Sequence, residues 1–136
     1  MIKETYCSFE VAKLLKEKGF NEQCRAAYTN YGKIFTTQIQ QYITNVLCSK
    51  SNLWECTAPT HQMAMAWLRE VHNLFIFPFP QRNTDSFWAE IYSIDKNKNE
   101  EDKWENLYCE TIDLKNYPTY EEAVETGLKY CLQNLI

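Results

Sequence analysis

Residues 54–80 read WECTAPTHQMAMAWLREVHNLFIFPFP, and the fold depends on the change of pattern inside this stretch. Thr57 predicts the cap of a helix, and Pro59 fits the first helical turn, where its missing N–H costs nothing. Apolar side chains then recur at the spacing of one helical face: Met63, Ala64, Trp67, Leu68 and Val71. His72 and Asn73 close this face, so a helix is expected to end where the pattern changes.

The residues that follow predict three strands in succession. Leu74–Phe79 is apolar on both sides, and Pro78 and Pro80 end this strand or place it at a sheet edge. Two further strands are expected within 86–95 (SFWAEIYSID) and 104–114 (WENLYCETIDL), joined by a charged hairpin tip. Because consecutive strands with short connections usually pair, the sequence predicts an antiparallel meander.

The last twenty residues, 117–136, predict a helix with a buried stripe. Thr119 and Glu122 have the spacing of a capping box. Leu128 and Leu132 belong to the apolar stripe and are expected to be buried against the sheet. Gly127 lies in the same stripe and costs about 1 kcal/mol against alanine in a helix, which indicates close contact with the sheet.

The N-terminal part predicts a helix and a hairpin. Ser8 is a good N-cap for a helix over residues 9–18, and Gly19 stands where such a helix ends. Two short runs, 24–29 and 33–37, flank Asn30-Tyr31-Gly32 and predict a β-hairpin. Between residues 39 and 47 the apolar positions favour a helix, although their β-branched and aromatic residues also suit a strand.

Together these elements predict an α+β fold. A three-stranded antiparallel sheet carries helices packed on it, in the order α-β-β-β-α from residue 58, preceded by the N-terminal helix and the hairpin. The chain is expected to form a single domain over 1–136, with the helix and hairpin in about 1–55 and the α-β-β-β-α unit in about 56–136.

Composition restricts the classes of function. The formal net charge is −4, and no stripe of basic residues stands out, so nucleic-acid binding is not favoured. Three glycines and no glycine-rich phosphate loop argue against nucleotide binding, and no cofactor is expected. The apolar runs are too short to span a membrane and no signal peptide is recognisable, so a cytoplasmic protein with reduced cysteines is expected.

Three blocks of the chain carry a resemblance. They are SFEVAKLLKEKGF at 8–20, APTHQMAMAWLREVHNLFI at 58–76 and YPTYEEAVETGLKYCLQNLI at 117–136. In these blocks and their order the chain resembles a group of small uncharacterised proteins encoded by gut anaerobic bacteria, their prophages and phages. The resemblance implies a mobile-element setting, and it implies no activity, substrate or catalytic residue.

Metal binding and thiol chemistry are both weakly supported by the sequence. His61 and His72 share a predicted helix, but eleven residues of rise separate them by roughly 16 Å, too far for one zinc ion. No metal site is therefore expected. Cys56 lies just before that helix, and His61 follows Cys56 closely in the sequence. This pair is therefore the weak candidate for a thiol nucleophile and its base. The alternative is that Cys56 is an ordinary buried thiol.

Aromatic residues make up 15% of the chain and predict either a thick core or an interaction surface. If both helices cover one face of the sheet, the other face exposes aromatic rings unless the N-terminal part covers it. The residues of this possible surface are Phe75, Phe77, Trp88, Tyr92 and Tyr108.

Three functional hypotheses follow. The first is a non-enzymatic accessory or protein-binding module of a mobile element, acting on an unknown protein partner or on its own copy. The second is a nucleic-acid-binding module, because double-stranded-RNA-binding domains share the α-β-β-β-α order. The third is a thiol-dependent enzyme centred on Cys56.

Overall fold

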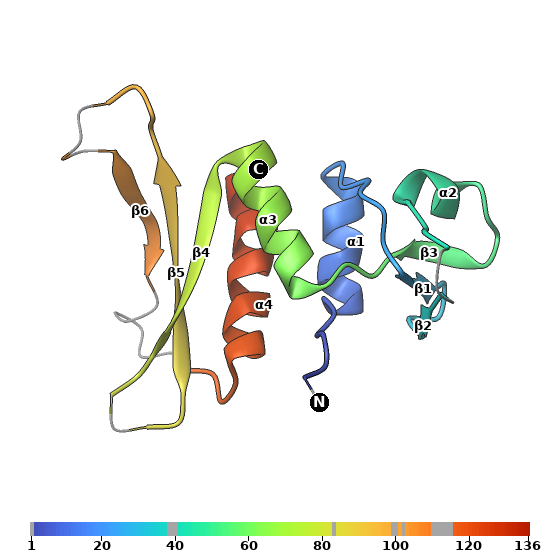
Figure 1. Cartoon of the computed structure of the whole chain (residues 1–136), viewed down its shortest axis with the longest axis horizontal. Helices are drawn as coiled ribbons and strands as arrows, with labels where there is room; N and C mark the ends of the chain where they lie inside the picture. Colours follow the sequence, from blue (N-terminus) through green and yellow to red (C-terminus); the bar gives the residue numbers. More distant parts are fainter. Residues whose placement is uncertain (1, 38–40, 83, 99–100, 102, 110–115) are drawn as a thin grey trace. The chain divides into compact units, whose positions relative to one another are not determined.

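The computed structural model describes residues 2–37, 41–82, 84–98, 101, 103–109 and 116–136 (Figure 1). It divides into two compact units, Met1–Ala64 and Met65–Ile136. Each unit contains one three-stranded sheet, whose strands pair antiparallel, and each unit also contains helices. The predicted α+β class is confirmed. The boundary between the units falls inside a helix, between Ala64 and Met65, whereas the subdivision was expected near residue 56.

The first helix, α1 (Phe9–Glu17), forms as its capping signals predict. The Ser8 hydroxyl accepts a hydrogen bond from the Val11 N–H at 3.2 Å. Gly19 adopts φ +94° just beyond the helix, a conformation that glycine reaches without a Cβ penalty. Leu15 is completely buried on the inner side of α1.

The sheet of the first unit has the order β2-β1-β3. Its strands are β1 (Ala26–Thr29), β2 (Ile34–Thr36) and β3 (Trp54–Thr57). Strand β3 is absent from the sequence prediction, which placed only the first two runs in strands. A strand of four residues is too short to show alternation, and its pairing partner lies more than twenty residues away in sequence.

The helix expected between residues 39 and 47 is wrong for most of its length. Ile43 forms an isolated antiparallel bridge with Cys24, and helix α2 spans only Asn45–Ser49. Thr44 caps α2 by accepting a hydrogen bond from the Leu47 N–H at 3.3 Å. Ile39 lies outside the described residues. The residues of this segment suit both a helix and a strand, and the backbone pairing of Ile43 with Cys24 decides between the two. The local sequence pattern does not reveal this pairing.

Small side chains allow close packing in the first unit. Its core cluster consists of Ala12, Ala26, Tyr28, Cys56 and Ala58. The Tyr28 hydroxyl donates a hydrogen bond to the Cys7 carbonyl at 2.6 Å. The Tyr28 ring also packs against the Phe9 ring, with 5.2 Å between the centroids.

Helix α3 (His61–His72) begins in the first unit and continues into the second. Its first turn is capped by Thr60, whose hydroxyl accepts from the Met63 N–H at 3.2 Å, so the predicted Thr57 cap is wrong. Thr57 is instead the last residue of β3. Asn73 follows α3 with φ +57°, the left-handed conformation in which asparagine often replaces glycine.

The exposure of α3 follows part of the predicted face, but Met65, which that face did not include, is buried as well. Trp67 and Leu68 are buried, and Arg69 and Glu70 are exposed, as predicted. Val71 was placed on the apolar face, but its side chain is 58% exposed.

The sheet of the second unit has the order β4-β5-β6. The strands are β4 (Leu74–Pro80), β5 (Phe87–Ile94) and β6 (Trp104–Cys109), and neighbouring strands are antiparallel. The third strand was expected to continue to Leu114. Residues 110–115 lie outside the described part of the chain.

Helix α4 (Tyr120–Tyr130) packs on β4 and β5 and continues into a π-helical segment, Cys131–Leu135 (Figure 1). The predicted capping box is present, with Thr119 and Glu122 bonded to each other's backbone N–H groups. Leu128 and Leu132 are completely buried, as predicted.

Candidate functional site

The two faces of the second sheet differ in their cover. Side chains alternate between the faces along a strand. One face carries Ile76, Ala89 and Ile91, which are buried, and α4 packs against it. Figure 1 shows α3 and α4 on the same side of this sheet. No described helix of the second unit lies on the opposite side.

That opposite side carries a connected set of aromatic rings, which we call the aromatic face. The central ring is Phe77, whose centroid lies 6.3 Å from Phe75, 6.4 Å from Phe79 and 5.7 Å from Tyr92. At the two ends, Trp104 packs on Phe75 at 4.8 Å and Trp88 stacks on Phe79 at 5.7 Å. The aromatic face therefore comprises Phe75, Phe77, Phe79, Trp88, Tyr92 and Trp104.

Several of these rings are open to solvent. Phe77 is 38% exposed, Phe79 is 36% exposed and Trp104 is 48% exposed. Single exposed apolar residues are normal on a protein surface, but a contiguous aromatic patch is a common mark of an interaction site. Tryptophan and tyrosine are also enriched at the centres of protein interfaces.

Four of the five residues predicted for this surface lie together on the aromatic face, and Tyr108 does not. Its ring stacks on Tyr130 of α4, with 4.0 Å between the centroids. Tyr92 pairs with Asn106, and if the register continued without a shift, Tyr108 would lie opposite Glu90. A bulge between Ile91 and Tyr92 instead pairs Tyr108 with Ile91, on the face that α4 covers.

The five residues predicted for this surface do not include Phe79 and Trp104, which also belong to the aromatic face. Phe79 follows Phe75 and Phe77 at the period of two, so the pattern that identified them also indicates Phe79. Trp104 pairs with Ile94 and could be placed only with the strand register known.

A carboxylate lies within the aromatic face. Glu90 of β5 pairs directly with Phe77 of β4. Along β5, Trp88 and Tyr92 lie two residues away on either side and therefore share its face. The Tyr92 hydroxyl donates to Glu90 Oε2 at 3.4 Å and accepts from the Asn106 side-chain N–H at 3.3 Å.

An open groove of about 600 Å³ adjoins one end of the aromatic face. Phe75 belongs to both, and Ile94 continues the line of Tyr92 into the groove. The remaining lining is mostly polar or charged: Arg69, Glu70, Val71, Asn73, Asp95, Lys96 and Asn97. The aromatic face thus offers apolar contact area to a ligand, and the adjoining groove offers polar groups that can orient it.

Prolines limit how the edge of β4 can be used. Pro78 and Pro80 lie within this strand and have no N–H to donate. An added strand on this edge would lose ladder hydrogen bonds at both positions. A partner is therefore better accommodated by the side chains of the aromatic face than by backbone pairing along this half of β4.

The candidate nucleophile Cys56 has the surroundings of a structural thiol. It lies in β3, is completely buried, and belongs to the core cluster of the first unit. Burial raises the pKa of the Cys56 thiol to about 12, with nearby Cys48 as a further cause. A nucleophilic cysteine needs the opposite shift, so this position does not favour thiol catalysis.

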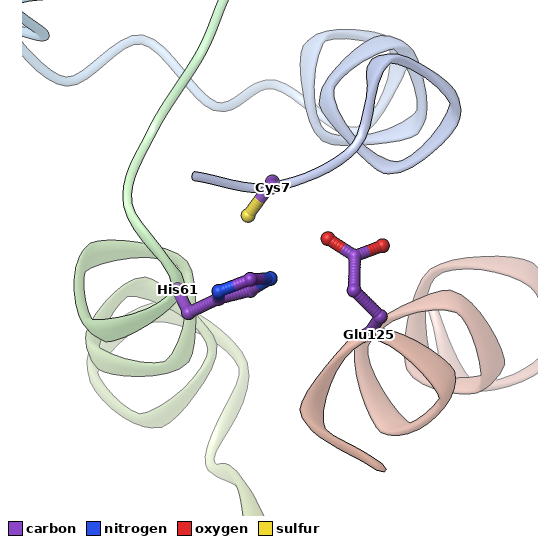
Figure 2. Close-up of side chains that lie close together, drawn as sticks. All are labelled: Cys7, His61 and Glu125. Atoms are coloured by element: carbon purple, nitrogen blue, oxygen red, sulfur yellow. The ribbon is translucent and has the colours of Figure 1, made fainter. Parts of the chain in front are cut away.

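His61 instead lies near Cys7, a neighbour that sequence spacing did not indicate (Figure 2). The Cys7 Sγ and a ring nitrogen of His61 are within 4.8 Å of each other. The Thr5 hydroxyl lies 2.7 Å from His61 Nδ1, and the His61 backbone N–H donates to the Thr5 carbonyl at 3.0 Å. Glu125, also drawn in Figure 2, belongs to the second unit.

A thiol beside an imidazole can serve as a nucleophile with its base or as two metal ligands. Cys7 is completely buried and His61 is 6% exposed, so a substrate has little access to either side chain. Two ligands are also half of the set that a structural zinc ion takes. The hydrogen bonds of Thr5 with His61 hold the N-terminal segment at the start of α3, and the Cys7–His61 pair is a weaker candidate site than the aromatic face.

The second histidine has a structural setting as well. His72 is the last residue of α3, and its ring packs edge-on against Trp67 with 4.7 Å between the centroids. His61 and His72 thus stand at opposite ends of one helix, as predicted.

No family model, curated protein or solved structure matches this chain. None of the helices in the described ranges combines the length and the apolar character needed to cross a bilayer.

Proposed function

We propose that this protein is a non-enzymatic protein-binding module that holds an extended segment of a partner protein on its aromatic face. The observation that carries the proposal is the set of contacting, partly exposed rings on the side of the second sheet away from α4. Such rings contribute large apolar contact area and lose little side-chain entropy on binding. The mobile-element setting stays a prediction from the resemblance.

A partner of different chemistry is favoured over a second copy of this chain. In a two-fold face-to-face dimer the same patch meets itself, so two Glu90 carboxylates would be enclosed between aromatic faces that supply no basic group. Like charges at the centre of an interface oppose association. The net charge of −4 further opposes self-association and favours a partner with basic groups.

Nucleic acid is the weaker alternative. Aromatic rings on a sheet can stack bases, as they do in single-strand-binding proteins. Those proteins also carry Lys and Arg for the phosphates, whereas this face holds Glu90 and the whole chain is acidic. A salt-sensitive complex with single-stranded RNA or DNA that is lost on Phe77→Ser would replace the proposed protein partner.

The test is a selection of random twelve-residue peptides on the immobilised protein, followed by affinity measurement with purified variants. Phe77→Ser should weaken the recovered peptides by roughly 30-fold or more, since an aromatic anchor at an interface contributes about 2 kcal/mol or more. Phe35→Ser is the matched control because Phe35 is 45% exposed on β2 of the first unit.

Two results would contradict the proposal. One is recovery of peptides whose affinity is equal for wild type and the folded Phe77→Ser variant. The other is a stable homodimer in sedimentation that dissociates on Phe77→Ser, since a second copy would then occupy the aromatic face.

A further inference from the structure

Glu90 gives the aromatic face a charge as well as a shape. Its direct cross-strand neighbour is Phe77, and its neighbours along β5 on the same face are Trp88 and Tyr92. A formal negative charge thus lies among rings whose own faces are electrostatically negative. Both features attract the same kind of ligand group, a cation with apolar or planar character.

Tyr92 and Trp104 are tilted against Phe77, so the rings of the aromatic face present their faces in more than one direction. Tyr92 is inclined by 69° and Trp104 by 65° to the plane of Phe77. A planar cation can therefore stack on one ring while its edge points toward another group. The Tyr92 hydroxyl, 3.4 Å from Glu90 Oε2, ties the carboxylate to the ring beside it.

Arginine fits these surroundings better than lysine. Its guanidinium group is planar, stacks on aromatic rings and donates parallel hydrogen bonds to a carboxylate. Lysine provides a compact charge with a tighter hydration shell, and it gains less from the rings.

We propose that Glu90 and the surrounding rings bind an arginine side chain of the partner segment. The inference rests on the proposed function, because it names the chemistry of the segment that the aromatic face holds. Apolar residues next to this arginine would cover the outer rings, Phe79 and Trp104. The groove that begins at Phe75 would receive the polar continuation of the segment.

The probes for this inference are two nine-residue peptide libraries. One has arginine fixed at the central position, and the other has citrulline, which keeps the shape and loses the charge. Peptide retained on the immobilised protein is quantified by mass spectrometry. Wild type should retain roughly tenfold more of the arginine library, as expected for a cation that gains both ring contacts and a carboxylate partner.

Two variants separate this specific contact from general attraction to an acidic protein. Glu90→Gln should reduce the preference for arginine to about twofold or less. Glu105→Gln removes the same charge from an exposed position on β6 and should keep the preference. Glu105 pairs with Ser93, so it lies on the face of the sheet opposite to the aromatic face.

Equal retention of the two libraries by wild type would overturn the arginine site, and so would an undiminished preference in Glu90→Gln. If peptides still bind and Phe77→Ser abolishes their binding, only the arginine site fails. If retention does not depend on Phe77, the proposed function fails with it.

Discussion

Gly127 of α4 lies against Ile76 of β4 so closely that a Cβ atom at position 127 would stand 2.7 Å from Ile76 Cγ2. This contact holds the helix on one face of the second sheet. Ile76 and its buried neighbours face α4, and alternation then directs Phe75 and Phe77 to the other side. The aromatic face thus depends on where α4 packs.

Gly127→Ala should destabilise the protein, although alanine favours a helix by about 1 kcal/mol. We expect a net loss of about 1–2 kcal/mol in the free energy of unfolding, because the new methyl group overpacks the contact with Ile76. Urea denaturation measures it. In an Ile76→Leu background, where the side chain has no methyl group on Cβ, the loss should shrink. A Gly127→Ala variant that is more stable than wild type would contradict the close contact.

Leu128→Ala should reduce the free energy of unfolding by about 2–5 kcal/mol, because the deleted atoms leave a cavity at a fully buried position. Leu53→Ala is the control, since Leu53 is 57% exposed and should lose less than about 1 kcal/mol. Equal midpoints in urea for wild type and Leu128→Ala would show that α4 does not pack as described.

Asn45→Ala tests the first unit. The Asn45 side chain donates to the Phe20 carbonyl at 2.7 Å and accepts from the Thr57 N–H at 2.8 Å, and the residue is buried. Alanine would leave both backbone groups without this partner, at a cost of about 1–3 kcal/mol for each that stays unsatisfied. Asn30→Ala is the comparison, because Asn30 makes its bond to Asn52 at an exposed site. Thermal unfolding of both variants should show a much larger loss for Asn45→Ala.

Part of this arrangement is predictable from the sequence because its signals are local. The Thr119–Glu122 capping box defined the start of α4, and Gly127 inside an apolar stripe indicated a close helix–sheet contact. The alternation of Phe75 and Phe77 along one apolar run was sufficient to place both rings on the same face of the sheet.

The parts that failed depend on pairing between distant residues. The bulge at Ile91 turns Tyr108 away from the aromatic face, and no residue in the strand signals this by itself. Strand β3 forms only because β1 offers an edge, and Ile43 is held by its bridge to Cys24. The neighbourhood of Cys7 and His61 arises in the same way, through backbone bonding between segments more than fifty residues apart.

The buried thiol of Cys56 predicts a specific response to alkaline pH. Its pKa is raised from 9.0 to about 12, so between these values the unfolded chain loses a proton that the folded chain keeps. The contribution of this thiol to the free energy of unfolding is fully present below pH 9. It falls as the pH rises toward 12, by at most about 1.4 kcal/mol per pH unit.

Cys56→Ala should therefore show a flatter decline of stability above pH 9 in urea titrations. Iodoacetamide should label Cys56 of the folded protein far more slowly than that of the denatured chain at pH 8. Rapid labelling of native Cys56 at pH 6 would contradict its burial and would support the hypothesis of a thiol-dependent enzyme.

The four tryptophans allow the most direct test of the central claim. Trp88 and Trp104 belong to the aromatic face, whereas Trp54 lies in β3 and Trp67 is buried in α3. The measurement is a titration of ¹⁵N-labelled protein with a peptide from the random library, following the indole N–H signals. Our account predicts that the Trp88 and Trp104 signals shift to saturation while those of Trp54 and Trp67 stay in place. Saturable binding that moves Trp54 or Trp67 and leaves Trp88 and Trp104 unchanged would contradict it.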